Sequence, residues 1–301
     1  MVKLTRPEGW QPEDFHTTRR AIAPMFFAGY AAAAVAADAQ EKTIHTDEEG
    51  LICEAIRIPG GNAPIPAYVA RPNARGRFPT IIVIPEVFGL HEYIRDTCRR
   101  LAKLGYVALA PDTFFRAGDP APLTDLAKIQ EVVAKATNAQ VMDDLNSIGK
   151  WIERQPFAQN AFGITGFCWG GAVVWMALAR FSGLKAGVAW YGRLRKPPAG
   201  QFLGDEARPW PLDIATQVRS PILGLYGGRD QGIPKSDVDE MNGLLQRMNR
   251  TGSQIIVYPD AQHGFHADYR ATYNEAAAKD GWNKMLAHFA RNGLAPRPAG
   301  R

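Results

Sequence analysis

From residue 51 onward, short apolar runs alternate with longer segments in which apolar residues recur every three or four positions. The short runs predict β-strands, and the longer periodic segments predict helices that bury one face. The expected strands cover residues 52–58, 65–71, 80–85, 107–110, 162–165, 187–190, 221–226 and 254–258. The expected helices cover residues 92–104, 123–154 (as one helix or two), 170–181, 235–249 and 271–291.

This alternation indicates the fold class. Residues 80–85, TIIVIP, form a continuous β-branched run, which is typical of a strand buried on both faces of a parallel sheet. The first two strands are joined across a Gly-Gly-Asn turn and predict a hairpin. The later strand, helix, strand units imply parallel strands with right-handed crossovers. We therefore expect one α/β domain with a doubly wound, mostly parallel sheet between two layers of helices. The Pro-rich residues 195–211 are expected to form a surface excursion.

The N-terminal residues 1–39 differ from this pattern. An arginine pair at positions 19 and 20 precedes an uncharged, Ala-rich run at 21–37, and Ala-Asp-Ala at 37–39 has the form of a signal-peptidase site. These features resemble a twin-arginine export signal. We expect residues 1–39 to be a signal or leader and residues 40–301 to be the folded domain of a periplasmic protein. The alternative is a cytoplasmic protein whose N-terminal helix packs on the domain, or whose start codon is wrongly chosen.

The composition narrows the function further. With 301 residues, 46% hydrophobic and 22% charged, the chain can bury one large core. The net charge is +5, but Lys and Arg are scattered and not interleaved with aromatic residues, so nucleic acid is not an expected partner. After residue 39 no segment is apolar enough to span a bilayer. Three cysteines are too few and too irregularly spaced for a disulfide scaffold or a zinc site. Dinucleotide and P-loop motifs are also missing, so we expect no metal and no cofactor.

Three residues with catalytic potential follow the ends of predicted strands. In open α/β sheets, sites form beyond the carboxyl ends of the strands. Cys168, Asp230 and His263 each lie just after such an end, in the order nucleophile, acid, histidine. In this arrangement His263 would act as general base toward the thiol, and Asp230 would hold the histidine tautomer. Each residue alone has an ordinary structural explanation, as core packing, a surface group or a turn; the combined order favours catalysis.

The sequence around Cys168, GFCWGG, has the form Gly-x-Cys-x-Gly of a nucleophile elbow. Gly166 and Gly170 would let the strand and the following helix approach closely, because neither carries a Cβ atom. The amide of Trp169, at the helix N-terminus, would point at a developing oxyanion, and the amide of Val87 is the candidate for the second donor. The sequence therefore predicts a thiol presented at a strand-to-helix turn.

Five motifs resemble the dienelactone hydrolase family, whose members are thiol enzymes of the α/β-hydrolase superfamily. They are PEVFGL at 85–90, GFCWGG at 166–171, WYG at 190–192, YGGRD at 226–230 and AQHGF at 261–265, and the resemblance covers about residues 50–292. It implies an α/β-hydrolase fold and hydrolysis of a cyclic enol ester during breakdown of aromatic compounds. It also implies that Cys168 is the nucleophile, that Asp230 and His263 are its partners, and that Glu86 helps to switch the thiol into its attacking position.

The chain departs from the family where the substrate carboxylate binds. The family uses arginines there, one of them a few residues after the histidine, whereas the first arginine after His263 is Arg270. Arg116 and Lys128 are the nearest candidates for a second arginine, and neither is a confident equivalent. The apolar part of the pocket is expected to include Phe88, Trp190, Tyr191 and Phe265, although each aromatic ring could equally belong to the core.

These features together predict a metal-independent, monomeric hydrolase that cleaves a small-molecule ester or lactone through a cysteinyl acyl-enzyme. A carboxylesterase for small aryl esters on the same scaffold is the first alternative. A catalytically silent protein that binds ligands or senses thiol oxidation is the second. Retention of both Asp230 and His263 argues against the silent protein, because neither residue would then be needed.

Overall fold

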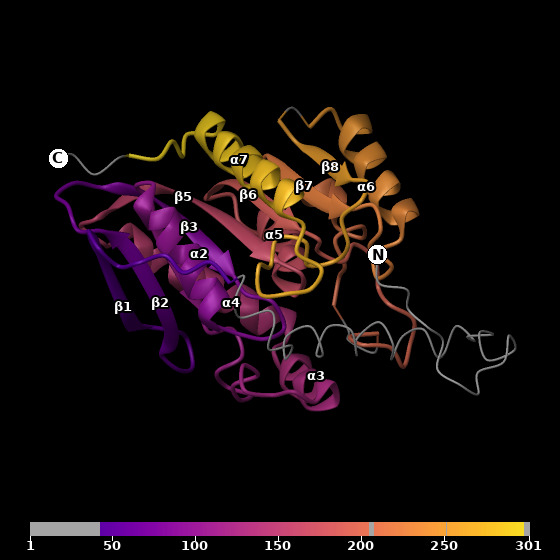
Figure 1. The fold of residues 1–301 in the computed structure, drawn as a ribbon, viewed down its shortest axis with the longest axis horizontal. Coiled ribbons are helices and arrows are strands. Elements are labelled where there is room, and N and C mark those ends of the chain that lie inside the picture. Colours follow the sequence, from indigo (N-terminus) through magenta and orange to yellow (C-terminus); the bar gives the residue numbers. More distant parts are fainter. Residues whose placement is uncertain (1–42, 205–207, 251, 298–301) are drawn as a thin grey trace, which may run out of the picture.

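Eight strands form one sheet in the order β1-β2-β4-β3-β5-β6-β7-β8 (Figure 1). The computed structural model describes residues 43–204, 208–250 and 252–297, so the expected leader at 1–39 lies outside the described residues and stays a prediction. The strands are β1 (Leu51–Ile58), β2 (Ile65–Pro72), β3 (Phe78–Ile84), β4 (Val107–Pro111), β5 (Ala158–Phe167), β6 (Leu184–Trp190), β7 (Ile222–Gly227) and β8 (Gln254–Tyr258).

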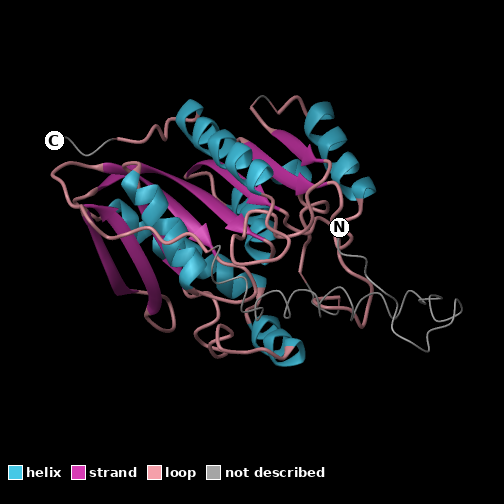
Figure 2. Cartoon of the chain, in the orientation of Figure 1, coloured by secondary structure: helices cyan, strands magenta, loops and turns pink. Residues whose placement is uncertain are grey.

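Helices cover both faces of this sheet, with α2 and α7 on one face and α4 and α5 on the other (Figures 1 and 2). The helices are α2 (Glu92–Lys103), α3 (Leu126–Lys135), α4 (Asn138–Glu153), α5 (Trp169–Arg180), α6 (Lys235–Arg247) and α7 (Glu275–Arg291), with a 3-10 turn η3 (Ala215–Gln217). The single α/β domain with a mostly parallel sheet is thereby confirmed. No helix in the described ranges is both long and apolar enough to cross a membrane.

Local chemistry explains where several elements begin and end. Residues 123–154 form two helices, because the chain leaves the helical conformation at Ala136 and the hydroxyl of Thr137 caps the second helix at the amide of Gln140. The last helix begins four residues later than expected, where Asn274 accepts a hydrogen bond from the amide of Ala277. Gly105 follows α2 with φ of +99°, as a helix-terminating glycine does.

The pairing pattern determines where the loops meet. β1 pairs with β2 as the expected hairpin, and β2 also pairs antiparallel with β4, which the sequence did not indicate. All other neighbouring strands are parallel. The carboxyl ends of β3, β5, β6, β7 and β8 therefore lie along one edge of the sheet, and the loops after them converge there.

Candidate active site

Cys168 occupies the turn between β5 and α5 in a strained conformation, with φ of 54° and ψ of −114°. Its amide donates a hydrogen bond to the carbonyl oxygen of Trp190, at 3.0 Å, which ties the turn to the neighbouring strand. Tyr191 and Leu203 also have positive φ, at 39° and 62°, and both line the same pocket as Cys168. Backbone strain of this kind in non-glycine residues concentrates at functional sites.

The elbow glycines let the strand and the helix approach each other, as the sequence predicted. A Cβ atom on Gly166 would lie 2.4 Å from the carbonyl oxygen of Gly170, and one on Gly170 would lie 2.4 Å from the carbonyl oxygen of Ile84. Both contacts involve backbone atoms, which cannot rotate away. Only glycine fits at either position without moving a strand.

We therefore expect Gly170→Ala to destabilise the domain by about 1–3 kcal/mol, since the added methyl group overpacks the contact with Ile84. Urea denaturation followed by circular dichroism measures the change. Gly61→Ala is the matched control, because Gly61 is exposed and a Cβ atom there meets nothing within 4 Å. An equal effect of the two substitutions would contradict the close-packing explanation.

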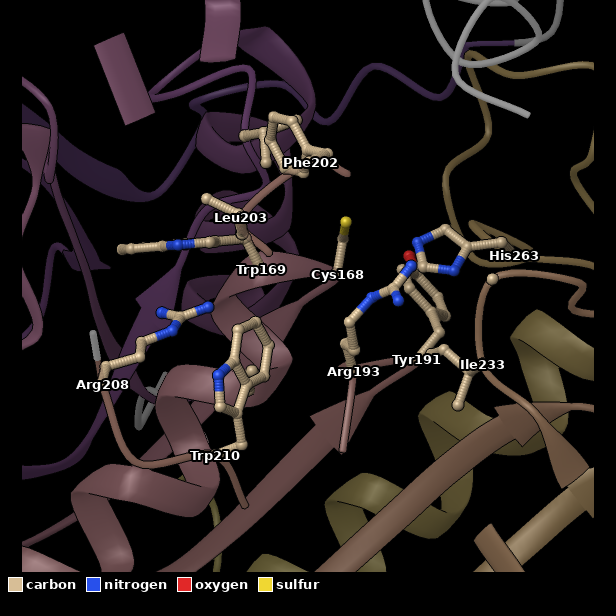
Figure 3. A pocket seen from close by; sticks show the side chains of 13 residues that line it. Cys168, Trp169, Tyr191, Arg193, Phe202, Leu203, Arg208, Trp210, Ile233 and His263 are labelled. Atoms are coloured by element: carbon tan, nitrogen blue, oxygen red, sulfur yellow. The ribbon is translucent and has the colours of Figure 1, made fainter. Parts of the chain in front are cut away.

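His263 and Asp230 form a close pair beside the thiol. The Nδ1 atom of His263 lies 2.6 Å from Oδ2 of Asp230, and the amide of Gly232 donates to Oδ1 of the same carboxylate at 2.9 Å. Burial lowers the pKa of His263 and raises that of Asp230. The neutral imidazole that results can accept a proton. Cys168 and His263 both line the pocket, and the ring of His263 extends toward Cys168 (Figure 3).

The thiol of Cys168 is neutral at physiological pH. Burial raises its pKa to about 12, and the negative charge of Glu86 adds to the shift, while Arg270 and the amide of Trp169 oppose it. Because the imidazole of His263 is also neutral, the proton that could pass between Cys168 and His263 resides on the sulfur. Formation of the thiolate therefore depends on proton transfer to His263 or on a change in the surroundings of Glu86.

Glu86 and Arg270 form a buried ion pair behind the thiol. Nη2 of Arg270 lies 3.2 Å from Oε1 of Glu86, and the hydroxyl of Tyr269 donates to Oε2 at 2.6 Å. His91 Nε2 lies 3.8 Å from Oε2. Burial by itself would raise the pKa of Glu86, but Arg270, His91 and Tyr269 outweigh burial and hold the pKa below its ordinary value. Glu86 is therefore ionised, and Arg270 is engaged by it.

The two amides expected to donate to an oxyanion belong to residues at this pocket. Val87 and Trp169 both line the pocket with Cys168. Within the described part of the chain, neither amide donates to another backbone group. The amide of Trp169 also acts on the sulfur of Cys168. The two amides therefore stay the predicted donors to a carbonyl oxygen that becomes negatively charged.

Three of the four side chains expected at the pocket lie elsewhere. Trp190 and Phe265 are fully buried in the core, where Trp190 donates to the hydroxyl of Thr165 at 3.2 Å. Phe88 is buried beside Arg270, whose guanidinium carbon lies 5.0 Å from its ring centroid. Only Tyr191 of the four is among the described residues that line the pocket. The core interpretation therefore holds for Trp190, Phe265 and Phe88.

The pocket has a volume of about 50 Å³ and includes residues that the sequence did not single out. Its walls are mostly apolar, and four of its thirteen lining residues come from the segment at 195–211, which therefore does more than form a surface excursion. The additional lining residues are Ala172, Arg193, Phe202, Leu203, Arg208, Trp210, Gly232 and Ile233. The sequence signal that could have found this wall is Trp210 itself, because a large aromatic side chain in a Pro-rich segment usually packs against the rest of the protein. In the structure Trp210 is only 1% exposed.

The other arginine, lysine and cysteine candidates from the sequence do not line this pocket. Arg116 makes an ion pair with Asp144, at 2.7 Å, and neither it nor Lys128 is among the described residues that line the pocket. Cys53 and Cys98 are free thiols. The described ranges contain no group of three or more His, Cys, Asp or Glu side chains that could hold a metal ion.

Comparison with known proteins identifies relatives over most of the chain. The Dienelactone hydrolase family matches residues 65–293. A candidate carboxymethylenebutenolidase of Methylorubrum extorquens is 45% identical over 282 residues, which cover 92% of this chain and 94% of that protein. A Bradyrhizobium protein assigned as a candidate 2-oxo-3-(5-oxofuran-2-ylidene)propanoate lactonase is 32% identical and covers 74% of this chain and 88% of its own. The crystal structure of a candidate dienelactone hydrolase from Klebsiella pneumoniae has a TM-score of 0.74 at 45% identity, covering 80% of this chain and 99% of that one.

Proposed function

The chain belongs to the dienelactone hydrolase family and is a carboxylic ester hydrolase; we propose that it cleaves esters or lactones with a Cys168, His263, Asp230 triad through a cysteinyl acyl-enzyme. The observation that carries this proposal is the position of Cys168. Its backbone is strained at the elbow, and its side chain lines the same pocket as His263, which pairs with Asp230. A thiol kept only for packing would need neither the positive φ nor the histidine partner.

In the proposed reaction, Sγ of Cys168 attacks the carbonyl carbon while its proton passes to Nε2 of His263. The carbonyl oxygen becomes negatively charged and accepts hydrogen bonds from the amides of Val87 and Trp169. The tetrahedral intermediate collapses as the bond to the leaving oxygen breaks, and His263 gives that oxygen its proton. Water, deprotonated by His263, then attacks the thioester and releases the acid and the thiol.

Asp230 would support both proton transfers from behind the ring. Its hydrogen bond to Nδ1 keeps Nε2 directed at the thiol and stabilises the imidazolium that forms. Glu86 would act on the thiol itself, because its charge raises the pKa of Cys168 in the resting enzyme. Displacement of Glu86 by a bound substrate would lower that pKa and favour attack.

Two substrate classes are compatible with this chemistry. The Bradyrhizobium relative is assigned to an unsaturated lactone that bears a carboxylate, which supports a lactone of that type. The apolar pocket wall formed by Phe202, Leu203 and Trp210 also favours small aryl esters, the alternative specificity. Both reactions use the same acyl-enzyme.

Trapping of the acyl-enzyme tests the proposal. We expect wild-type protein quenched with acid during turnover of p-nitrophenyl acetate to carry an acetyl group on the peptide that contains Cys168, because the thioester survives at low pH. Peptide mass spectrometry detects it, and the peptides with Cys53 and Cys98 serve as internal controls. Turnover with acetylation at another residue, or at none, would refute Cys168 as the nucleophile.

A further inference from the structure

Arg193 is a cation in the pocket for which the described residues supply no ion-pair partner. It lies in the loop after β6 and lines the pocket together with Cys168 and His263 (Figure 3). It forms no ion pair or hydrogen bond with another residue in the ranges that the structure describes. Two residues later, Arg195 behaves differently: its Nε donates to Asp237 at 3.0 Å, and its guanidinium also pairs with Glu240.

The backbone holds Arg193 firmly in this place. The amide of Tyr191 donates to the carbonyl oxygen of Leu225 at 2.8 Å. The next residue, Gly192, is so close to α5 that a Cβ atom on it would lie 2.4 Å from the amide nitrogen of Ala172. The backbone is therefore fixed immediately before Arg193 by its contacts with β7 and α5. A group that Arg193 binds would be positioned relative to the thiol.

The other arginines near the thiol are already engaged. Arg270 pairs with Glu86, and the guanidinium of Arg208 stacks on the ring of Trp210 with its carbon 4.3 Å from the centroid. Asp230 is the carboxylate that most influences Arg193, but its oxygens already accept from His263 and from the amide of Gly232. Arg193 is only partly exposed, so water only partly solvates its charge, and this burial lowers its pKa.

A guanidinium remains protonated in proteins, so its charge in a mostly apolar pocket costs free energy until an anion pairs with it. We propose that Arg193 is a specificity-determining residue that binds a carboxylate carried by the substrate. Planar carboxylates suit it best, because they accept two parallel hydrogen bonds from a guanidinium. This inference rests on the proposed function, since it takes the pocket beside Cys168 as the substrate site.

The position of Arg193 also indicates which half of the ester carries the charge. The guanidinium lies on the same side of the thiol as His263, and away from Phe202 and Trp210 (Figure 3). Asp230, the partner of His263, is the carboxylate that acts on it most strongly. His263 protonates the leaving oxygen in the proposed reaction, so the leaving group lies on its side of the thiol. The carboxylate is therefore expected on the leaving-group half.

A pair of isosteric esters tests this inference. The probes are 4-acetoxybenzoate, with a carboxylate on its leaving group, and 4-acetoxybenzamide, its neutral counterpart. We expect Arg193→Gln to lower the ratio of their kcat/KM values, charged over neutral, by about 10- to 100-fold, as loss of a charge-assisted bidentate contact does. Arg193→Lys should give an intermediate ratio, because it keeps the charge and loses the fork geometry. It also serves as a second variant if Arg193→Gln fails to fold.

Arg195→Gln is the matched control, since it removes the same charge from an ion-paired position two residues away. A ratio that stays within about twofold in Arg193→Gln, or that falls equally in Arg195→Gln, would overturn the inference. A binding measurement separates this outcome from failure of the proposed function. In Cys168→Ala, calorimetry should show 4-acetoxybenzoate binding at least about tenfold more weakly once Arg193→Gln is added. If the wild type hydrolyses neither ester, the binding measurement alone decides the role of Arg193.

Discussion

Cys168→Ala is expected to lower kcat/KM for p-nitrophenyl acetate and for a dienelactone by at least about a thousandfold. The variant keeps the pocket, the His263–Asp230 pair and the two proposed oxyanion amides, but it has no sulfur atom that can form the thioester. The residual rate would reflect binding and oxyanion stabilisation without covalent catalysis. Steady-state kinetics on each substrate measures the loss, and circular dichroism confirms that the fold is retained.

Cys53→Ala is the matched control for this prediction. Cys53 is also a free thiol, but it lies on β1, at the edge of the sheet. We expect its removal to leave hydrolysis within about twofold of the wild type, because surface and edge substitutions far from the chemistry have small effects. Equal activity of wild type and Cys168→Ala on both substrates would show that the catalytic nucleophile is another group.

The sequence predicted the fold well because local patterns and global topology agree in this chain. The run TIIVIP predicted β3, which is buried along its whole length. The alternation of strands and helices then predicted the doubly wound sheet that the structure has. It did not predict the antiparallel pairing of β2 with β4. That pairing depends on long-range contacts between strands about 40 residues apart, which no local pattern in either strand encodes.

The candidate site was predictable only where it follows from motifs. Cys168, Asp230 and His263 converge because each directly follows a strand, and parallel strands end at one edge. The pocket walls were harder to predict, since an aromatic side chain near a motif can point either to the core or to the site. The side chains of Trp190 and Phe265 lie in the core, whereas Trp210, which lines the pocket, belongs to a Pro-rich segment without periodicity. Such a segment gives no register from which to infer direction.

Arg270→Leu is expected to destabilise the protein by about 3–5 kcal/mol at neutral pH, because it leaves Glu86 as a buried charge without its cation. Both side chains are almost inaccessible, at 2% and 0% exposed. The second substitution in Glu86→Gln/Arg270→Leu removes the stranded charge and should recover much of the loss. Urea denaturation measures the free energy of unfolding of the wild type, the single variant and the double variant. Arg195→Leu, which breaks an ion pair at a half-exposed guanidinium, should cost at most about 1 kcal/mol.

The pH dependence identifies the charge on Glu86 as the cause. In the wild type the folded-state pKa of Glu86 is below its ordinary value of 4.5, so the ion pair stabilises the fold above that pH and its contribution is lost as the pH falls through the folded pKa. Arg270→Leu removes the strongest of the interactions that lower the pKa of Glu86. Burial, which raises that pKa, should then dominate and bring the folded-state pKa above 4.5. The variant should then lose stability as the pH rises from about 4 through that new pKa. The deficit relative to wild type should be largest at pH 7 and smallest near pH 4. A deficit that does not change with pH, or one no larger than that of Arg195→Leu, would show that lost packing rather than an unpaired carboxylate explains the effect.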